Sequence, residues 1–428
     1  MPLREDEIRW RRLIEDSFQR EAGSQAALPD ATQDLIQTGA LDSMGWVSFL
    51  RTLESASGRN DLGSQLTGRI PSFESILLVF RETGAAGRPL AAAVSFPTQV
   101  AKPGPVLIAA SSVALGSRIV ASEEVDKAFG MPHGKLRLRA GIESVAYAAE
   151  KEDENTLGTR AGQQALQSAS CAPQELDWII ATSETHHAYP SLSAQLHSQL
   201  LARETCGALD VGGACLGLLN GFAVAQALIT AKKVRSVLVV TADVHSHVFR
   251  PGLVAGEFGG LFGDGASAFL LRSSSNTPAQ VGYAVGEFFF GSAGQYMAAI
   301  SVTPAPVGGV DVYFDGEALS RAAITKLEKV VVDVEHRSGI ARSSVKGLAT
   351  HQPNPRLVTL LAKQLDIPED KFPIVARTFG NLGSSTCGVA LDSILRATDS
   401  DGNYAPGPIF LAALGPGLLF GGGWLVRA

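Results

Sequence analysis

From residue 106 onward the chain alternates short apolar runs with segments of helical periodicity. The apolar runs have the length and residue types of buried strands, and they lie at residues 106–111, 178–181, 236–242 and 266–271. Residues 217–230 form one of the helical segments between them. Because continuous apolar strands are expected where helices cover both faces of a sheet, the pattern predicts a layered α/β architecture.

The C-terminal part of the chain repeats this theme. It holds an apolar strand at 347–350, a Gly/Ser-rich loop at 381–385, a helix that runs to Leu395 and a strand at 409–413. Two halves with a similar order of elements suggest an internal duplication, although the identity between them is too low to show it. We expect the first half to span residues 105–275 and the second half residues 276–428.

The first 82 residues have a different pattern, that of a small helical unit. One helical stripe consists of Ile8, Trp10, Leu13, Ile14 and Phe18. Asp42-Ser43 is a good N-cap for a second helix, and a third opens at Ile70-Pro71-Ser72 and runs through Phe80. Residues 83–104 contain Gly, Ala and Pro without a sustained period, which predicts a semi-flexible linker.

Composition and charge narrow the class of protein. With 428 residues, 45% of them hydrophobic and 18% charged, the chain is long enough for two or three compact domains. No long block of Lys and Arg is present, so we expect no nucleic-acid partner. The charged start and the short, Gly-broken apolar stretches predict neither a signal peptide nor a membrane span, and we expect a cytoplasmic protein. Residues 1–85 hold 13 acidic residues against nine arginines, so most of the net charge of −6 lies there.

The cysteines and histidines do not form a metal-binding pattern. The four cysteines lie far apart with no CxxC pair, which argues against a disulfide framework and a zinc site. The pairs His186-His187 and His245/His247 lack ligands at matching spacing, so we interpret them as loop-surface residues and expect no metal.

Cys215 is the strongest candidate for chemistry. It follows Asp210-Val-Gly-Gly-Ala and precedes an apolar helical run, which places it at a helix N-terminus where the backbone dipole favours a thiolate. The alternative is a small buried cysteine that packs near a tight turn.

His351 and Asn381 are the other candidates. His351 directly follows an apolar strand, and the ends of strands are where α/β proteins place their sites. Asn381 lies in a glycine-flanked loop before a helix, where it could equally be an ordinary helix cap. Together the three residue types suit thioester chemistry, with a thiolate to accept an acyl group and a neutral imidazole and an amide to stabilise negative charge on oxygen.

Residues 104–428 resemble the ketoacyl-ACP synthase III family of the thiolase superfamily. The motifs that carry the resemblance are Arg139-Ala-Gly-Ile142, Asp210-Val-Gly-Gly-Ala-Cys215-Leu-Gly217, Phe262-Gly-Asp-Gly-Ala-Ser267, His351-Gln-Pro-Asn354, Gly380-Asn-Leu-Gly-Ser384 and Gly415-Pro-Gly417. The resemblance implies a five-layered, duplicated α/β fold that forms a homodimer. It also implies that Cys215 is the acylated nucleophile, and that His351 and Asn381 bind the thioester oxygen while a malonyl-type extender loses carbon dioxide.

Residues 1–82 resemble an acyl carrier protein, through Leu35-Ile-Gln-Thr-Gly-Ala-Leu-Asp42-Ser43-Met44 and Ile70-Pro-Ser-Phe73. By that resemblance Ser43 carries a 4'-phosphopantetheine arm that a phosphopantetheinyl transferase attaches, although the same residues also make a capped helix. A carrier on a flexible tether would present its thioester at an effective concentration on the order of millimolar.

The acyl donor is either an acyl carrier protein or CoA. Members of the family that prime from CoA usually carry an aromatic residue ahead of the segment that matches Arg139 and a second Arg after it. The stretch from His133 to Ala146 has neither, which favours carrier-borne acyl groups.

Three functions remain open at this point. The first is a decarboxylating condensation in fatty acid or polyketide-type biosynthesis. The second is acyl transfer without decarboxylation, to a hydroxyl, an amine or a second carrier, through the same Cys215 and His351. The third is a catalytically silent subunit that docks a second synthase, against which the joint presence of Cys215, His351 and Asn381 speaks.

Overall fold

The chain forms two compact units, a small helical one and a large one that holds every strand of the described residues. The computed structural model describes residues 5–23, 26–59, 62–66, 69–83, 106–274, 282–305, 309–397 and 407–428. The predicted linker, residues 83–104, lies outside the described residues except for Thr83. The predicted boundary between residues 275 and 276 also lies outside them, so these limits stay predictions.

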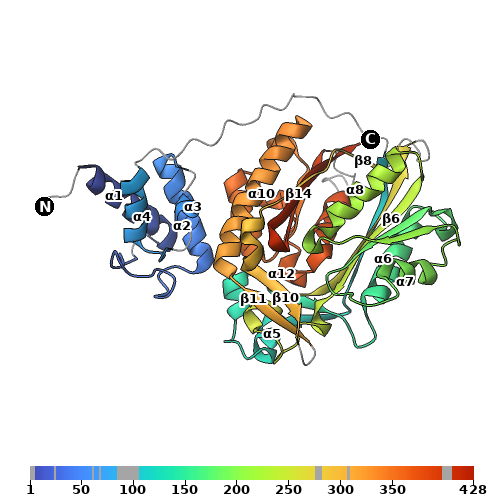
Figure 1. The fold of residues 1–428 in the computed structure, drawn as a ribbon, viewed down its shortest axis with the longest axis horizontal. Helices are drawn as coiled ribbons and strands as arrows, with labels where there is room; N and C mark the ends of the chain where they lie inside the picture. Colours follow the sequence, from blue (N-terminus) through green and yellow to red (C-terminus); the bar gives the residue numbers. More distant parts are fainter. Residues whose placement is uncertain are drawn as a thin grey trace. The chain divides into compact units, whose positions relative to one another are not determined.

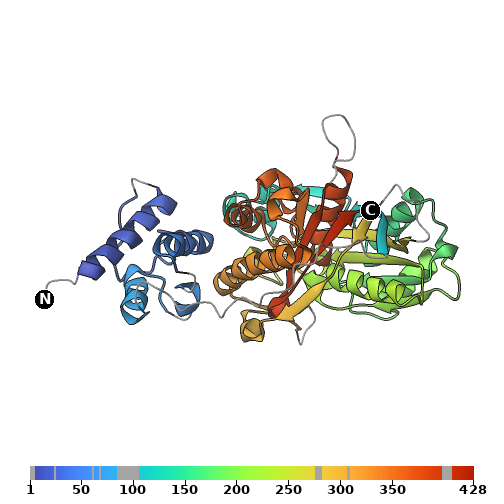
Figure 2. The same cartoon turned by 90° about the horizontal axis from the view of Figure 1, so that it is seen from above.

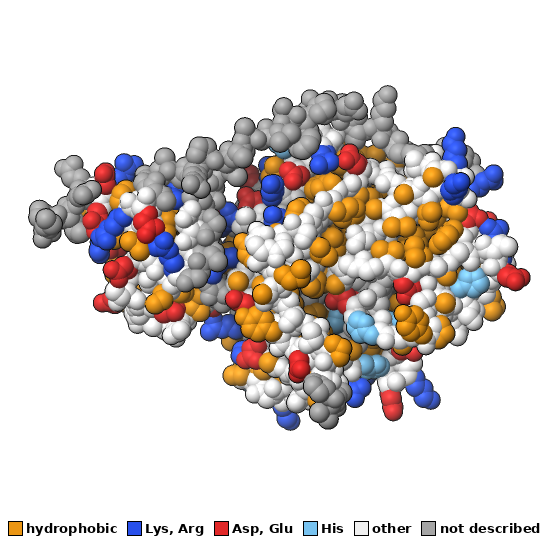
Figure 3. Space-filling view, viewed as in Figure 1, with side chains coloured by type: hydrophobic (Ala, Val, Ile, Leu, Met, Phe, Trp, Pro, Cys, Tyr) orange, Lys and Arg blue, Asp and Glu red, His pale blue; other side chains and the backbone are white. Residues whose placement is uncertain are grey.

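The small unit contains the three predicted helices. They are α1 (Glu5–Ala22), α2 (Ser43–Ser57) and α4 (Phe73–Thr83), with the short α3 (Leu62–Gln65) between the last two. Phe18, Trp46 and Phe49 are fully buried where the apolar faces meet. Figure 3 shows charged side chains of both signs crowded on the visible face of this unit, whereas apolar and uncharged groups dominate that of the large unit.

The first half of the large unit is a mixed sheet with the strand order β1-β7-β6-β4-β5. β4 runs parallel to both β5 and β6, and β7 runs antiparallel to β6 and β1. All four strands predicted here are present and somewhat longer than expected. Their bounds, with that of β5, are β1 (Val106–Leu115), β4 (Trp178–Thr182), β5 (Gly207–Asp210), β6 (Ser236–Val244) and β7 (Asp264–Ser273).

The second half repeats this arrangement and continues the same sheet. β12 runs parallel to β13, and β14 runs antiparallel to β13, as β4, β6 and β7 do in the first half. β8 pairs with both β1 and β14 and joins the halves into one ten-stranded sheet. The bounds are β8 (Tyr283–Val285), β9 (Phe289–Ser292), β12 (Gly347–Thr350), β13 (Ile409–Gly415) and β14 (Leu419–Arg427).

Helices complete five layers. α6 (Glu154–Ser168) and α7 (Leu192–Gln199) pack on one side of the first half, and Figure 1 shows α8 (Gly217–Thr230) on the other side of β6. α8 and α13 (Thr386–Arg396) share one apolar core with strands of both halves. α10 (Gly316–Ser338) covers the second half, and Figure 2 shows this orange helix beside the red C-terminal strands. The predicted layered α/β fold and its duplication are therefore confirmed.

Close contact between α10 and the sheet depends on one glycine. A Cβ atom on Gly422 of β14 would lie 2.7 Å from Val330 and 2.8 Å from Val334 on α10, closer than carbon atoms pack. Only glycine therefore lets this helix reach the strand.

The other described elements are short or lie at the periphery. They are β2 (Arg118–Ala121), β3 (Ser144–Tyr147), β10 (Ile300–Pro304), β11 (Val310–Phe314), α5 (Ser122–Ala128), α9 (Gly256–Gly259), α11 (Pro355–Leu365) and α12 (Ala376–Phe379). None of the described helices has both the length and the apolar character needed to cross a membrane.

We expect Phe222→Ala on α8 to lower the free energy of unfolding of the large unit by about 3–5 kcal/mol, because the ring is fully buried and packs edge-on against Phe269. Urea unfolding followed by circular dichroism measures the loss. Phe290→Ala is the matched control, since that ring is 43% exposed and should cost far less. Equal losses in the two variants would contradict the assignment of α8 to the central layer.

Candidate active site

The predicted chemical residues lie in turns and loops that lead out of strands or into the central helices. Cys215 comes after β5, in the single turn η3 (Ala214–Leu216) that leads into α8. His351 is the first residue after β12, and Asn381 precedes the turn η9 (Gly383–Ser385) that leads into α13. The η3 turn packs against η9 and against the end of β13. The structure thus brings the Cys215 turn and the Asn381 loop together where α/β proteins place their sites.

A strained turn presents Cys215. Gly213 has φ +123° and Ala214 has φ +49°, which is unusual for a residue with a side chain. A Cβ atom on Gly213 would lie 2.2 Å from the Asn220 amide nitrogen, which donates a hydrogen bond of 2.9 Å to the Gly212 carbonyl. Gly213 is therefore needed for the close approach between the turn and the first helical residues of α8.

The expectation of a stabilised thiolate at Cys215 is wrong for the structure as it stands. The side chain is 8% exposed, and burial raises the pKa of its thiol well above the ordinary value. The negative charge of Glu184 raises this pKa further. Loss of solvation and a neighbouring carboxylate outweigh the helix N-terminus, so the thiol is protonated at rest.

His351 is a neutral imidazole in the structure. It is 5% exposed, and burial lowers its pKa to about 4. Its Nδ1 atom is buried and has no hydrogen-bond partner within the described part of the chain. The imidazole also interacts with the backbone of Gly383, two residues beyond Asn381. The neutral state is the one expected of a donor to a developing oxyanion.

Hydrogen bonds to both the N–H and the carbonyl group fix the backbone of Asn381. Its N–H donates to the Leu261 carbonyl at 2.8 Å, and its carbonyl accepts from the Gly263 N–H at 2.9 Å. The side-chain oxygen accepts from the Gly383 N–H at 3.0 Å and from the Thr386 hydroxyl at 3.2 Å. Asn381 therefore caps the η9 turn with its oxygen, and its amide N–H₂ group is the part left to donate to a ligand.

Two further ionisable residues lie in the same cluster. Glu184 follows β4 by two residues and His245 directly follows β6, and a Glu184 oxygen lies 3.5 Å from Nε2 of His245. The His245 Nδ1 atom lies 3.0 Å from the Gly263 carbonyl. Burial acts to lower the pKa of His245, but the Glu184 carboxylate that faces it at 3.5 Å and the charge of Asp243 raise it to about 9. At neutral pH the two side chains form a buried carboxylate–imidazolium pair.

Asp243 at the end of β6 links the two loops that carry these groups. Its carboxylate accepts hydrogen bonds from the backbone N–H of Glu184 and from the hydroxyl of Ser183. It also accepts from the N–H of Ser384 at 2.8 Å and from the Ser384 hydroxyl at 2.6 Å. Burial, and then the charge of Glu184, raises the pKa of Asp243 to about 6. One carboxylate therefore orients the Glu184 loop and the Asn381 loop together.

The sequence pattern that pointed to His351 also applies to Glu184 and His245, but these two residues were not predicted as site residues. Glu184 and His245 each come at the end of an apolar strand, the same kind of position that drew attention to His351. The interpretation of His245 as a loop-surface residue was wrong, because its side chain is 1% exposed. Among the described residues, no group of His, Cys, Asp and Glu has the arrangement of a metal site.

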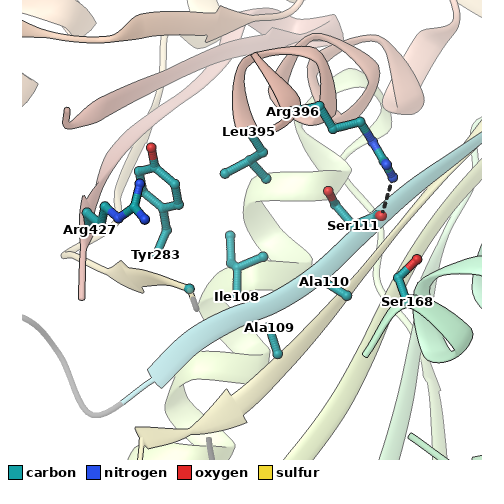
Figure 4. Close-up of a pocket in the computed structure, with 10 residues that line it drawn as sticks. Ile108, Ala109, Ala110, Ser111, Ser168, Tyr283, Leu395, Arg396 and Arg427 are labelled. Atoms are coloured by element: carbon teal, nitrogen blue, oxygen red, sulfur yellow. Dashed lines mark hydrogen bonds between the residues drawn. The ribbon is translucent and has the colours of Figure 1, made fainter. Parts of the chain in front are cut away.

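A separate surface pocket of about 260 Å³ lies away from this cluster. Figure 4 shows the residues that line it, which come from β1, from β8 and from the ends of α6, α13 and β14. Arg396 donates a hydrogen bond of 2.7 Å to the Ser111 carbonyl there. Cys215, His351 and Asn381 are not among its lining residues, so the pocket is not the predicted site.

Comparison with known proteins now adds to this geometry. Residues 209–294 match the model of 3-oxoacyl-(acyl-carrier-protein) synthase III, and residues 336–427 match that of the C-terminal part of the same family. The β-ketoacyl-(acyl-carrier-protein) synthase III of Haemophilus ducreyi is 29% identical over 324 residues, which cover 74% of this chain and 96% of that protein.

Solved structures give the same result for the fold. The priming β-ketosynthase from the R1128 polyketide biosynthetic pathway matches with a TM-score of 0.68 and 23% identity, over 78% of this chain and 99% of that one. The 3-oxoacyl-(acyl carrier protein) synthase III from Pseudomonas aeruginosa matches with a TM-score of 0.66 and 25% identity, over 76% of this chain and 98% of that one.

The large unit therefore has the thiolase-like α/β fold of these solved structures. The two matched models, both of 3-oxoacyl-(acyl-carrier-protein) synthase III, include the positions of Cys215, His351 and Asn381.

The neutral state of His351 predicts a pH dependence of stability. Its pKa is about 4 in the folded chain and near 6.5 when unfolded, so the unfolded state takes up the proton first as the pH falls from 6.5 to 4. We expect this residue alone to cost about 3 kcal/mol of unfolding free energy between pH 7 and pH 4. Urea unfolding of the wild type and of His351→Gln at both pH values isolates the effect. If both proteins lose the same stability, His351 is not buried in the neutral form.

Proposed function

We propose that the chain is a β-ketoacyl-(acyl-carrier-protein) synthase III-like condensing enzyme. Cys215 takes up an acyl group, which then condenses with a malonyl-type thioester. The observation that carries the proposal is the packing of the Cys215 turn against the Asn381 loop, with a neutral His351 in contact with that loop. The matched relatives, which are named as synthases of this kind, support it.

The chemistry follows from the groups present. The Cys215 sulfur forms a bond to the acyl carbon of the donor thioester, and the donor thiol leaves with the proton. When the malonyl-type thioester loses carbon dioxide, the electron pair moves into an enolate whose oxygen accepts hydrogen bonds from His351 and from the amide of Asn381. The enolate carbon then attacks the acyl carbon, and the sulfur of Cys215 leaves. A neutral imidazole suits this role because it donates without carrying a charge that would need a counterion.

A second function is acyl transfer without decarboxylation, to a hydroxyl, an amine or a second carrier. The observation that favours it is the Glu184 carboxylate beside Cys215, because a carboxylate is a base for the proton of such an acceptor. Mass spectrometry of the products with and without a malonyl carrier separates the two functions, since only the condensation needs the malonyl group.

We also propose that residues 1–82 are an acyl carrier domain with 4'-phosphopantetheine on Ser43. Ser43 is the first residue of α2, and the side chain of the preceding Asp42 accepts a 2.7 Å hydrogen bond from the N–H of Gly45. The cap of the helix is therefore supplied by Asp42, the residue before Ser43. The arm would supply a thiol for thioesters, and the tether would deliver them to Cys215 at raised effective concentration.

We further propose a homodimer with donors borne by a carrier protein or by CoA. β5 is the last strand on its side of the sheet, and Leu209 in the middle of it is 38% exposed. An open edge of this kind is a ready surface for pairing with a second strand.

Cys215→Ala should abolish both acyl uptake and product formation. His351→Ala and Asn381→Ala should still take up the acyl group, but condensation should fall about 10²–10³-fold with each donor that is removed. Intact-protein mass spectrometry detects the adduct, and product analysis with a malonyl carrier measures condensation. Cys206→Ala is the control, since Cys206 is buried elsewhere in the large unit and should change neither. An adduct on Cys215→Ala would disprove the role of this residue.

Ser43→Ala should remove the phosphopantetheine mass and leave the fold intact, because Asp42 still caps α2. The chain is co-expressed with a phosphopantetheinyl transferase, and its intact mass and circular dichroism are compared with those of the wild type. Ser48→Ala on the same helix is the control and should keep the modification. A modified Ser43→Ala chain would rule this attachment site out.

A further inference from the structure

Glu184 is the ionisable group of the site for which the proposed condensation has no task. Its side chain is 14% exposed, and its Oε1 atom is buried without a hydrogen-bond partner of ordinary geometry in the described part of the chain. Its other oxygen faces His245 at 3.5 Å. The Cys215 thiol lies within interaction range of the same carboxylate.

The position of this carboxylate is fixed rather than incidental. Asp243 accepts a hydrogen bond from the backbone N–H of Glu184, and His245 is in turn held by the Gly263 carbonyl at 3.0 Å. Gly383, with φ +56°, lies so close that a Cβ atom there would be 2.5 Å from the His245 ring. Three loops therefore press the Glu184–His245 pair into one arrangement beside the nucleophile.

Cys215 needs a proton acceptor because burial keeps its thiol protonated at rest. His351 is a poor acceptor, since burial disfavours its charged form. Glu184 is ionised, because its interaction with His245 lowers its pKa against the effect of burial. Among the described residues that interact with the thiol, it is the group that is both anionic and free on one oxygen.

We propose that Glu184 is the proton partner of Cys215: the carboxylate accepts the thiol proton when the sulfur attacks an electrophile, and hands it to a departing thiolate or, when iodide leaves, to water. This rests on the proposed function for its natural substrate. In acyl uptake the bond between Sγ and the acyl carbon forms, the bond between that carbon and the donor sulfur breaks, and the proton passes from Sγ through Glu184 to the departing sulfur. Glu184 ends the step ionised, so atoms and charge balance.

His245 acts as a positioning residue in this scheme. Its cation keeps Glu184 ionised, so His245→Gln should move the acid limb of the reaction profile to higher pH. The other ionisable groups that face the pair are Asp243 from β6, Asp264 from β7 and His351 after β12. Asp243 and Asp264 both favour the imidazolium through their charge.

The experiment measures the rate of modification of Cys215 against pH, from pH 6 to pH 9, in the full chain. Two electrophiles are used, an acyl-carrier thioester and iodoacetamide, and adducts are located by peptide mass spectrometry with Cys215→Ala as the blank. The variants are Glu184→Gln, which keeps the shape but cannot accept a proton, and Glu184→Asp, which keeps the base. Glu175→Gln, an exposed carboxylate in the same unit, is the matched control.

We expect Glu184→Gln to change the slope of the logarithm of the modification rate against pH. In the wild type a thiol and an ionised carboxylate react together, so the rate should be nearly flat with pH. In Glu184→Gln only the free thiolate reacts, so the rate should rise about tenfold per pH unit and lie about 10²–10⁴-fold below wild type near neutral pH. Glu184→Asp should react more slowly than wild type but keep the flat profile, and Glu175→Gln should match wild type.

A wild type whose rate already rises tenfold per pH unit overturns the proposal, and this test needs no variant to fold. Equal slopes in wild type and a folded Glu184→Gln overturn it as well. Iodoacetamide needs no acyl-transfer function, so the two proposals fail separately. A wild type that is not acylated but shows the slope change with iodoacetamide rejects the proposed function and retains Glu184 as the proton partner.

Discussion

The two halves of the sheet bury their apolar faces against the same pair of helices. This shared apolar core restricts where charged side chains can lie. Between α8, α13 and the strands the interior is filled by rings and branched side chains such as Phe222 and Phe269. A charge placed there would lose its water without gaining a partner. The ionisable groups of the candidate site accordingly lie outside this core, in or next to the turns where the two halves meet. Packing there is so tight that a Cβ atom on Gly217, the first residue of α8, would lie 2.0 Å from the Thr182 hydroxyl.

The two histidines of the site differ in charge at neutral pH because their surroundings shift their pKa values in opposite directions. For His351 the loss of solvation outweighs the charge of Glu184, and its pKa falls to about 4. His245 is equally buried but faces Glu184, and its pKa rises to about 9. At neutral pH the first is an uncharged donor and the second a cation. Groups whose environments push their pKa values apart in this way are typical of sites that move protons.

Much of the fold and part of the site were predictable from the sequence, because both follow from local patterns. The strand Gly347–Thr350 and the helix Gly217–Thr230 have the predicted bounds, and Cys215, His351 and Asn381 lie before α8, after β12 and before α13 as expected. The charge state of Cys215 was not predictable, since it depends on burial and on a carboxylate 31 positions earlier in the chain. The Glu184–His245 pair likewise arises from the pairing of β4 with β6, where Thr182 lies opposite Thr241. That register brings together residues that no short motif connects.

Asp243 is a hydrogen-bond anchor that two loops of the site share. Its two oxygens hold the loop after β4 and the loop before α13, so Glu184 and Asn381 share one anchor. A substitution at this one residue would therefore release the anchors of both loops at once, and the damage would appear as a single event rather than as two separate local defects.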